Sequence, residues 1–505
     1  MEISLEQHNL VVAERDRLAG ELAQLNVEVK LLKDKLQYVL KQLFGSKSEK
    51  INPDQLQLLL EGAPAAVEAE AALESEEVVA TRKRAARKPL AERLPENLPI
   101  VEEVIEPAEV QAAPELFRRI GEEVTVELDV TPAKFFQRHI IRPKYVRKDD
   151  RSLPPVVAPA PRRVIEHSFA SVGLLVAILL GKYSDHLPLY RQEQIFKVRY
   201  GVTLSRKTMC GWIGQVAHQL GMIYEALRDE IRNSGYIQAD ETPVDFLDPG
   251  SGRCGRGFLW TYRASGNGVL FEWFPSRAAD CLKGMLAGFK GHLQSDGYAA
   301  YLAYFAKLAQ RALGQEVELL ACWAHVRRKF FEAKEEDPLC AKVLAHIQEL
   351  YRIEAELRAQ GASPAERLAA RQERSLPVLG TIEQLLRSAS FLPKSLGGQA
   401  VAYTLELWER LLVYTRHGHL EIDNNLVENA IRPTAVGKKN WLFFGSAEAG
   451  QSSAIVFSLL ESCRMLGLNP QEYLLDVLPR LPTMTNQTAH LYTPSKWLAA
   501  RQPVK

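Results

Sequence analysis

One stretch of the chain, Gly418–Ser446, carries side chains that could bind a metal ion beside a polyanion. It contains the acids Asp423 and Glu428, and three cations follow them: Arg432, Lys438 and Lys439. Carboxylate oxygens suit Mg²⁺ or Mn²⁺, which complete their coordination with water and substrate phosphate. The stretch therefore predicts metal-dependent chemistry on a phosphate-rich partner, if further carboxylates reach it.

Two aspartates upstream are candidates for the missing ligands. Asp240 and Asp296 each lie where a predicted strand ends, before Thr242-Pro243 and Gly297 respectively, and ligands collect at strand ends in α/β domains. Asp-Gly and Asp-Asn-Asn are also common turn signals. Other acids compete for the same role, and spacing alone does not select among them: Glu241, Asp245, Asp248, Glu272 and Asp423.

The elements around these acids predict an α/β domain in two parts, 233–333 and 416–447. A helix is expected over Ala278–Ala287, and strands are expected over Tyr236–Ala239, Phe258–Tyr262, Val269–Phe274, His292–Ser295 and Glu318–Trp323. The second and third strands should form a hairpin around Gly266-Asn267-Gly268. Residues 334–415 are charged and helical and predict an all-helical insertion. Residues 448–505 predict C-terminal helices with a loose tail around Thr483–Asn486.

A helix-turn-helix pattern precedes this domain, in the helical stretch 166–232. The helix Leu189–Val198 is followed by a turn containing Gly201, and Ser205 caps a second helix. Four residues at the start of that second helix would face DNA: Ser205, Arg206, Lys207 and Thr208. Many helical hairpins share this pattern, so by itself it indicates DNA binding without establishing it.

The first 165 residues predict three smaller parts. Residues 1–50 carry apolar residues at alternating spacings of four and three from Leu18 to Leu43, which favours a coiled coil between chains over a helix packed on its own domain. Residues 51–99 read as a flexible linker whose basic run, 82–88, is either solvated or binds phosphate non-specifically. Residues 100–165 predict a small β-rich module, with alternating strands at Val124–Val130 and within Phe136–Ile141.

Bulk composition excludes several classes of protein. A chain of 505 residues needs several domains. Its 63 Lys+Arg and 62 Asp+Glu balance, so net charge does not indicate a nucleic-acid partner. The six cysteines form no CxxC pair, which predicts a reducing compartment. The polar N-terminus and the short apolar run Val172–Leu180 predict a cytoplasmic protein without a membrane span.

Several motifs in order resemble the bacterial insertion sequence 66 transposases of the TnpC type. They are FGSKSEK (44–50), KYSDHLPLYRQ (182–192), ADETP (239–243), DGY (296–298), CWAHVRRKF (322–330), IDNNLVE (422–428) and KNWLF (439–443). Together they span nearly the whole chain and are highly specific. The resemblance selects Asp240, Asp296 and Glu428 as the catalytic, metal-binding triad.

The resemblance implies a fold and an activity. The fold is a multidomain α/β protein with a ribonuclease-H-like DDE core, interrupted by the helical insertion and preceded by the coiled coil, the β-rich module and the helix-turn-helix. Two Mg²⁺ or Mn²⁺ ions would activate water or a 3′-hydroxyl and stabilise the leaving oxygen. The expected activity is cleavage at the terminal inverted repeats of an insertion sequence and joining of the 3′-ends to target DNA.

The partners expected are therefore DNA ends, target DNA, further copies of the chain in a dimer or larger oligomer, and accessory proteins of the element; the expected location is the bacterial cytoplasm, at the nucleoid. Phosphates near the metals would be held by Arg327, Arg328, Lys329, Arg432, Lys438 and Lys439, although a solvated charged face is the simpler interpretation. A ribonuclease-H-like nuclease without strand transfer and a catalytically inactive DNA-binding protein remain alternatives.

The chain departs from the family pattern at two places. Many members carry two Cys pairs flanking the β-rich region, but the corresponding stretches here, Ala112–Arg119 and Tyr145–Asp150, contain no cysteine. No zinc is expected in this protein, and thiolate binding at that place is excluded because the ligands are missing. Lys438 stands where the family usually has Arg, which keeps the charge and loses the bidentate geometry. No second Cys/His pair lies near Cys322 and His325, so a zinc site is not expected there. We expect Cys322 to be a packed thiol and His325 to contact phosphate or a strand.

Overall fold

The computed structural model describes the ranges 134–145, 156–248, 253–297, 299–310, 317–335 and 337–501, together with Arg15, Arg17, Leu18 and Gln111. The chain divides into two compact units, Met1–Phe136 and Gln137–Lys505. The predicted linker, the strand at Val124–Val130 and the coiled coil beyond Leu18 lie outside the described residues. The architecture below is that of the second unit.

The described part of the predicted β-rich module contains two short strands. β1 (Lys144–Tyr145) pairs antiparallel with β2 (Val156–Val157), and both are exposed. The strand predicted within Phe136–Ile141 is wrong, since these residues have no regular secondary structure. Their side chains are exposed, so the alternating pattern buries no apolar face that would stabilise a strand.

Three helices follow, with ends that the sequence specifies. They are α4 (Val172–Tyr183), α5 (Leu189–Tyr200) and α6 (Arg206–Arg232). Gly201 ends α5 with φ 66°, a left-handed conformation that glycine adopts without strain. The Ser205 hydroxyl accepts from the backbone N–H of Thr208, which begins α6 where the sequence predicted.

The domain that contains the three predicted carboxylates is built on one mixed sheet. Its order is β5-β4-β3-β6-β7, and β8 also pairs with β3. The strands are β3 (Tyr236–Leu247), β4 (Cys254–Ala264), β5 (Gly268–Phe274), β6 (Gly291–Gln294), β7 (Val317–Leu320) and β8 (Phe443–Phe444). β3, β4 and β5 are antiparallel neighbours, whereas β6, β7 and β8 join in parallel. The predicted hairpin between β4 and β5 is confirmed.

Two predicted strand ends are wrong. β3 does not stop at Asp240 but continues to Leu247, where it pairs with Cys254 of β4. β7 stops at Leu320, and Trp323 begins α9 (Trp323–Ala333). The predicted helix over Ala278–Ala287 forms as two consecutive short turns, η3 (Ala279–Leu282) and α7 (Lys283–Leu286).

A gap in strand pairing explains how Pro243 fits inside β3. On one side of β3, β6 pairs only up to Gln238, and β8 pairs only from Asp245. The Pro243 carbonyl faces this gap, because it accepts a 3.0 Å hydrogen bond from Lys438 Nζ. A residue's N–H and C=O point to the same side of a strand, so the missing proline N–H costs no ladder bond.

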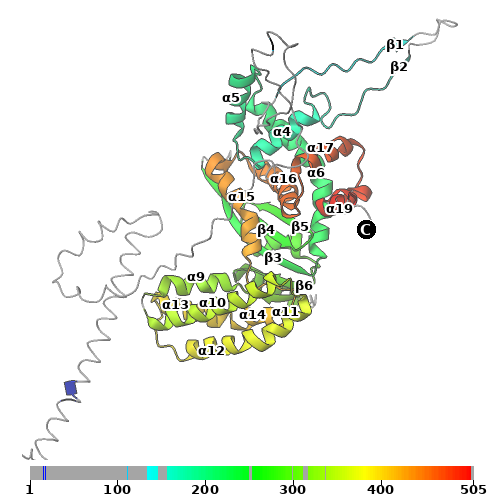
Figure 1. Ribbon diagram of the computed structural model, residues 1–505. Coiled ribbons are helices and arrows are strands. Elements are labelled where there is room, and N and C mark those ends of the chain that lie inside the picture. Colours follow the sequence, from blue (N-terminus) through cyan, green and yellow to red (C-terminus); the bar gives the residue numbers. More distant parts are fainter. Residues whose placement is uncertain are drawn as a thin grey trace, which may run out of the picture. The chain divides into compact units, whose positions relative to one another are not determined.

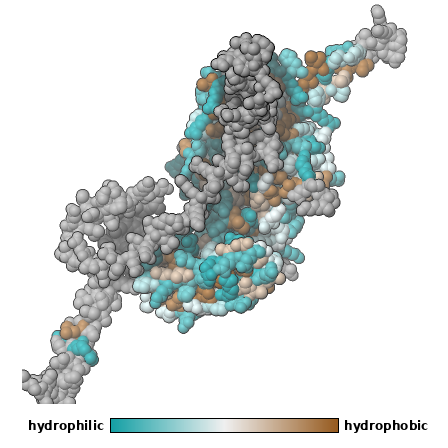
Figure 2. Space-filling model, viewed as in Figure 1, coloured by the Kyte–Doolittle hydropathy of each residue, from teal (hydrophilic) through white to brown (hydrophobic). Residues whose placement is uncertain are grey.

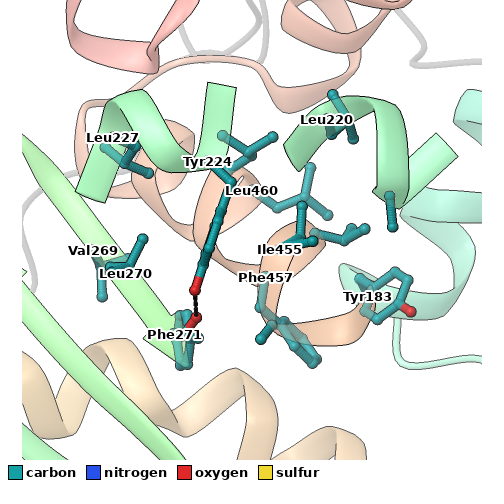
Figure 3. Close-up of a cluster of buried hydrophobic side chains, with 14 of the residues drawn as sticks. Tyr183, Leu220, Tyr224, Leu227, Val269, Leu270, Phe271, Ile455, Phe457 and Leu460 are labelled. Atoms are coloured by element: carbon teal, nitrogen blue, oxygen red, sulfur yellow. Dashed lines mark hydrogen bonds between the residues drawn. The ribbon is translucent and has the colours of Figure 1, made fainter. Parts of the chain in front are cut away.

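A hydrophobic core on one face of the sheet joins α6, β5 and α16 (Ala447–Met465). Figure 3 shows Tyr224 reaching down from α6, where its hydroxyl donates a 2.8 Å hydrogen bond to the Phe271 carbonyl. Two α16 serines serve the edge strand: Ser458 accepts from Phe271 N and Ser462 from Val269 N. Hydroxyls thereby satisfy backbone donors that an edge strand otherwise leaves open.

The predicted helical insertion lies between β7 and Glu428. After α9 come α10 (Pro338–Ala359), α11 (Pro364–Ala370), α12 (Leu376–Arg387), α13 (Leu396–Glu406) and α14 (Trp408–Leu412), with a π-helical turn at Arg371–Ser375 and a 3₁₀ turn, η5, at Val413–Arg416. These helices pack together (Figure 1) around their own buried cluster, to which α9 contributes Trp323 and Phe330. Their visible outer face is mainly hydrophilic (Figure 2).

α15 (Asn425–Trp441) leaves the insertion and lies against β3 and β4. The chain ends in α17 (Pro470–Val477), η6 (Leu478–Thr483), α18 (Asn486–Ala489), η7 (His490–Tyr492) and α19 (Pro494–Ala499). The loose tail predicted around Thr483–Asn486 is therefore wrong, since helical turns continue through it and bury Ala489 and Trp497. No described helix is long and apolar enough to cross a membrane.

Candidate active site

Asp240 lies in the unpaired gap of β3. It lies two positions beyond Gln238, which is the last residue of β3 that pairs with β6. One of its carboxylate oxygens accepts a 2.8 Å hydrogen bond from the backbone N–H of Glu241. α15, the helix that carries Glu428, packs against β3 and β4 and so lies near this strand.

Asp296 follows the end of β6 by two residues. The turn depends on Gly297, whose φ of 91° disfavours any other residue and whose absent side chain leaves room for Leu407. The Tyr403 hydroxyl of α13 donates a 2.5 Å hydrogen bond to the Asp296 backbone carbonyl. The insertion thus holds the turn that presents this carboxylate.

Glu428 lies in the first turn of α15. The turn before the helix is fixed by Asp423, which accepts from the Asn425 backbone N–H at 3.1 Å and side-chain amide at 2.7 Å. Asp423 is therefore a turn residue, as the sequence indicated. Buried Gln238 of β3 donates to the Asp423 carbonyl at 2.8 Å and ties the start of α15 to the sheet.

The structure brings the three predicted carboxylates to one place. Burial raises the pKa of Asp240 to about 7, and the negative charges of Glu241, Asp296 and Glu428 contribute further. Like charges raise a pKa only when they are close and poorly screened. Asp240, Asp296 and Glu428 come from a strand, a turn and a helix far apart in the sequence, so the influence of the other two on Asp240 indicates a single acidic site.

His325 is a fourth member that sequence reasoning did not assign to the site. It lies in the first turn of α9, with its Nε2 3.7 Å from Glu428 Oε1. Burial lowers the pKa of His325, whereas Glu428 and Asp296 raise it. Neighbouring Cys322 is a packed thiol, since burial raises its pKa to about 12. In the sequence, the signal that could have assigned His325 to the site was its position shortly after the end of a strand.

The competing acids have other partners. Glu241 is ion-paired with Arg277, and Glu272 lies 3.2 Å from Arg228. Asp245 is exposed farther along β3. Glu241 still affects its neighbours, because its charge raises the pKa of Asp240. Its ion pair with Arg277 makes it a supporting acid rather than an open metal ligand.

The predicted phosphate-binding cations divide into two groups. Arg432 and Lys439 are exposed and, at 100° per residue, fall on the same side of α15 as Glu428. Lys438 instead bonds the Pro243 carbonyl and braces β3. On α9, Arg327 and Arg328 are exposed, and Lys329 lies 4.6 Å from the centre of the Tyr403 ring.

The predicted DNA-facing residues of α6 also divide. Arg206 and Lys207 are exposed at the start of the helix. Ser205 and Thr208 are occupied by the cap, with their hydroxyls 2.9 Å apart. Two exposed cations at the start of a helix suit phosphate contact.

The donor set of the acidic site fits Mg²⁺ or Mn²⁺. All three carboxylates are oxygen donors, and Glu428 Oε1 is buried without a hydrogen-bond partner among the described residues. The carboxylate oxygens of the triad do not all lie within 4.8 Å of one another. Among the described residues, one other set of three side chains does meet this limit. An arrangement wider than a one-ion cage suits ions that also bind water and phosphate.

Comparison with known families covers the segment that contains this site. Residues 167–452, which include all three carboxylates, match the model described as Transposase IS66 family. The chain belongs to the IS66 transposase family. Residues 31–102 of this transposase match the model described as Transposase C of IS166 homeodomain, and residues 458–491 match the IS66 C-terminal element.

Relatives of this transposase occur in Sinorhizobium fredii. The uncharacterized protein y4jD is 32% identical over 95% of this chain and 97% of its own length. The uncharacterized protein y4qI is 36% identical over 76% of this chain and 73% of its own length. The similarity to y4jD extends over nearly the whole chain, beyond the segment that contains the acidic site.

Proposed function

We propose that this transposase cuts DNA at the ends of its insertion sequence and joins the freed 3′-ends to target DNA, with Asp240, Asp296 and Glu428 binding two Mg²⁺ or Mn²⁺ ions. The observation that carries the proposal is that Asp296 and Glu428 lie close enough to Asp240 for their charges to contribute to its raised pKa. A triad that converges from distant segments, with a buried unpaired oxygen, is costly without a cation.

The chemistry requires two displacements at phosphorus. In the first, water attacks the scissile phosphate and the DNA 3′-oxygen leaves; in the second, that 3′-hydroxyl attacks a target phosphate and the target's own 3′-oxygen leaves. When bound, the ions would activate the attacking oxygen and stabilise the leaving one. The chain's own residues hold the acids in place: the Glu241 N–H bonds Asp240, Tyr403 fixes the Asp296 turn, and His325 contacts Glu428.

DNA would lie along the exposed cations around this site. Arg432 and Lys439 on α15, with Arg327 and Arg328 on α9, would contact phosphates near the metals, and Arg206 and Lys207 would contact an inverted repeat. Two ends must be processed together, so we propose that the transposase acts as a dimer or larger oligomer on bacterial DNA in the cytoplasm, through its N-terminal heptads and with accessory proteins of the element.

The test is a cleavage and strand-transfer assay on DNA carrying the ends of the element, with Mg²⁺. Asp240→Asn, Asp296→Asn and Glu428→Gln should each reduce cleavage by about a thousand-fold or more, since a metal ligand supplies several kcal/mol. Asp245→Asn is the matched control, because Asp245 lies on the same strand and is exposed. It should cleave like the wild type.

Full activity in any of the three variants would remove that residue from the triad. Cleavage without joined products would favour the nuclease alternative. DNA binding with no Mg²⁺-dependent nicking in the wild type would favour a catalytically inactive DNA-binding protein.

A further inference from the structure

A second polar cluster lies at the other end of β6, outside the acidic site. The register of β6 and β7 places His292 directly opposite Glu318. His417, which follows η5, reaches the same carboxylate. His292 Nε2 and His417 Nε2 each lie 3.4 Å from Glu318 Oε2.

These distances match those between ligands that share one metal ion. Bonds of about 2.0–2.1 Å in a tetrahedral site place neighbouring ligand atoms about 3.3 Å apart. The three donor atoms of His292, Glu318 and His417 lie within 4.8 Å of one another, and no other set among the described residues meets this limit. A separation of 3.4 Å is also longer than the usual N–H···O hydrogen bond.

The donor types favour a transition metal. Two imidazoles and a carboxylate suit Zn²⁺ and leave a fourth position for water. The competing cation, Arg416, lies 3.3 Å from the other oxygen of Glu318, Oε1, and leaves Oε2 to the histidines.

The segment that carries His417 is held rigidly before any ion binds. The Arg371 guanidinium is fully buried and donates to the carbonyls of Tyr414, His417 and Leu420 at 2.8–2.9 Å. Glu354, also fully buried, balances its charge at 2.7 Å. Arg371 begins the π-helical turn, a feature that is frequent at functional sites.

The cluster is separate from the acidic site and open to solvent. His292 precedes Asp296 by four residues, which is about 13 Å along an extended strand. The side chains of Glu318 and His417 are 39% and 37% exposed, so an ion can enter from water.

We propose that His292, Glu318 and His417 bind one Zn²⁺ ion, which fastens the end of the helical insertion to the β6–β7 edge of the sheet. The sequence alone predicted no zinc, because the β-rich module lacks thiolate ligands and no second Cys/His pair accompanies Cys322 and His325. This site uses imidazoles that are 125 positions apart in the chain and meet only in the folded domain.

The test uses the full chain, stripped with a chelator and titrated calorimetrically with ZnCl₂ in excess MgCl₂, which occupies the carboxylate site. The wild type should bind one Zn²⁺ that is weakened about 100-fold or more in His417→Gln and in Glu318→Gln. Zinc should raise the melting temperature of the wild type and not that of the variants. His490→Gln, an exposed histidine outside the cluster, is the matched control and should bind like the wild type.

Exposed thiols such as Cys210 and Cys254 also bind zinc, so Co²⁺ substitution identifies the ligands. The site should give d–d absorption without a thiolate charge-transfer band, and the d–d absorption should vanish in His292→Gln. Equal zinc affinity in the wild type and in both His417→Gln and Glu318→Gln would overturn the proposal. So would zinc binding that is seen only with thiolate charge transfer.

Discussion

The two ends of strand β6 offer a comparison within one small region. His292 lies near its start and Asp296 just past its end, and a second segment supplies His417 to one cluster and Glu428 to the other. The acidic end gathers oxygen donors, and the charges of Asp296 and Glu428 contribute to the raised pKa of Asp240, whereas the other end gathers two imidazoles around one carboxylate. The same backbone therefore presents sites for different classes of metal, and the side-chain donor decides which.

The two ends also differ in how the second segment is fixed. Near the acidic end, sheet residues hold it: Gln238 donates to the Asp423 carbonyl, Gln294 donates to the Glu421 carbonyl at 3.0 Å, and Tyr236 accepts from the Glu421 N–H. At the histidine end, a helix of the insertion holds it through Arg371. Changes in the insertion should therefore reach the histidine cluster first.

Removing Arg371 should give the largest effect. Arg371→Met removes one donor from each of three carbonyls and leaves the buried Glu354 with Arg367 as its remaining charged partner, so the free energy of unfolding should fall by about 3–5 kcal/mol. Urea denaturation measures the loss. Hydrogen exchange should show greater opening at 414–420 than at 236–240.

Arg374→Met is the matched control, because Arg374 lies in the same turn and its ion pair with Glu356 is partly exposed. It should cost at most about 1 kcal/mol. Equal loss in both variants would show that Arg371 does not fix the histidine end in particular.

Some of these elements and site residues could be predicted from the sequence, and others could not. The Ser205 cap and the Gly-Asn-Gly hairpin follow from local chemistry, and both formed where predicted. The triad was selected by family motifs, since turn signals at Asp-Gly and Asp-Asn-Asn are ambiguous. Strand β3 was predicted too short because Pro243 reads as a breaker, and only the tertiary gap between β6 and β8 accommodates it.

The histidine cluster could not be predicted from the sequence. His292, Glu318 and His417 lie on separate elements, and no spacing rule relates them. The parallel register of β6 and β7 joins the first two, and the buried Arg371 places the third. His325 was easier to anticipate as a site residue, because it follows the end of a strand. Its contact with Glu428, however, depends on how α15 packs.

The acidic end should respond to pH in the absence of metal. Asp240 has a pKa of about 7 in the folded state against 3.8 as the ordinary value. Between these values the folded state keeps a proton that the unfolded state has lost, so this group's contribution to stability falls as pH rises from about 4 to 7. Asp240→Asn should therefore gain up to about 4 kcal/mol relative to the wild type across this window.

Urea denaturation in chelator at pH 5 and pH 8 measures this difference. Adding Mg²⁺ at pH 8 should stabilise the wild type more than the variant, because the ion favours the ionised carboxylate. Asp245→Asn is again the control and should show no pH-dependent difference from the wild type. A constant difference between Asp240→Asn and the wild type would contradict the raised pKa.

The smallest effect should come from Tyr403, which links the insertion to the acidic end. Tyr403→Phe removes the hydrogen bond to the Asp296 carbonyl and should cost about 0.5–1.5 kcal/mol of stability, with less than about a tenfold loss of cleavage. Tyr190→Phe, at an exposed tyrosine of α5, is the control. Cleavage as low as in Asp296→Asn would mean that the tyrosine acts in the chemistry itself.

The separate hydrophobic cluster of the insertion has a consequence for folding. Asp296 and Glu428 are far apart in the chain, and closing a long flexible loop costs entropy that grows with its length. Helices α10–α14 pack around their own core together with α9. If that core forms early, the chain between Asp296 and Glu428 is already compact when the site assembles. Glu428 then meets the two aspartates at a lower cost in loop-closure entropy. The insertion would then determine the order of assembly of the active site.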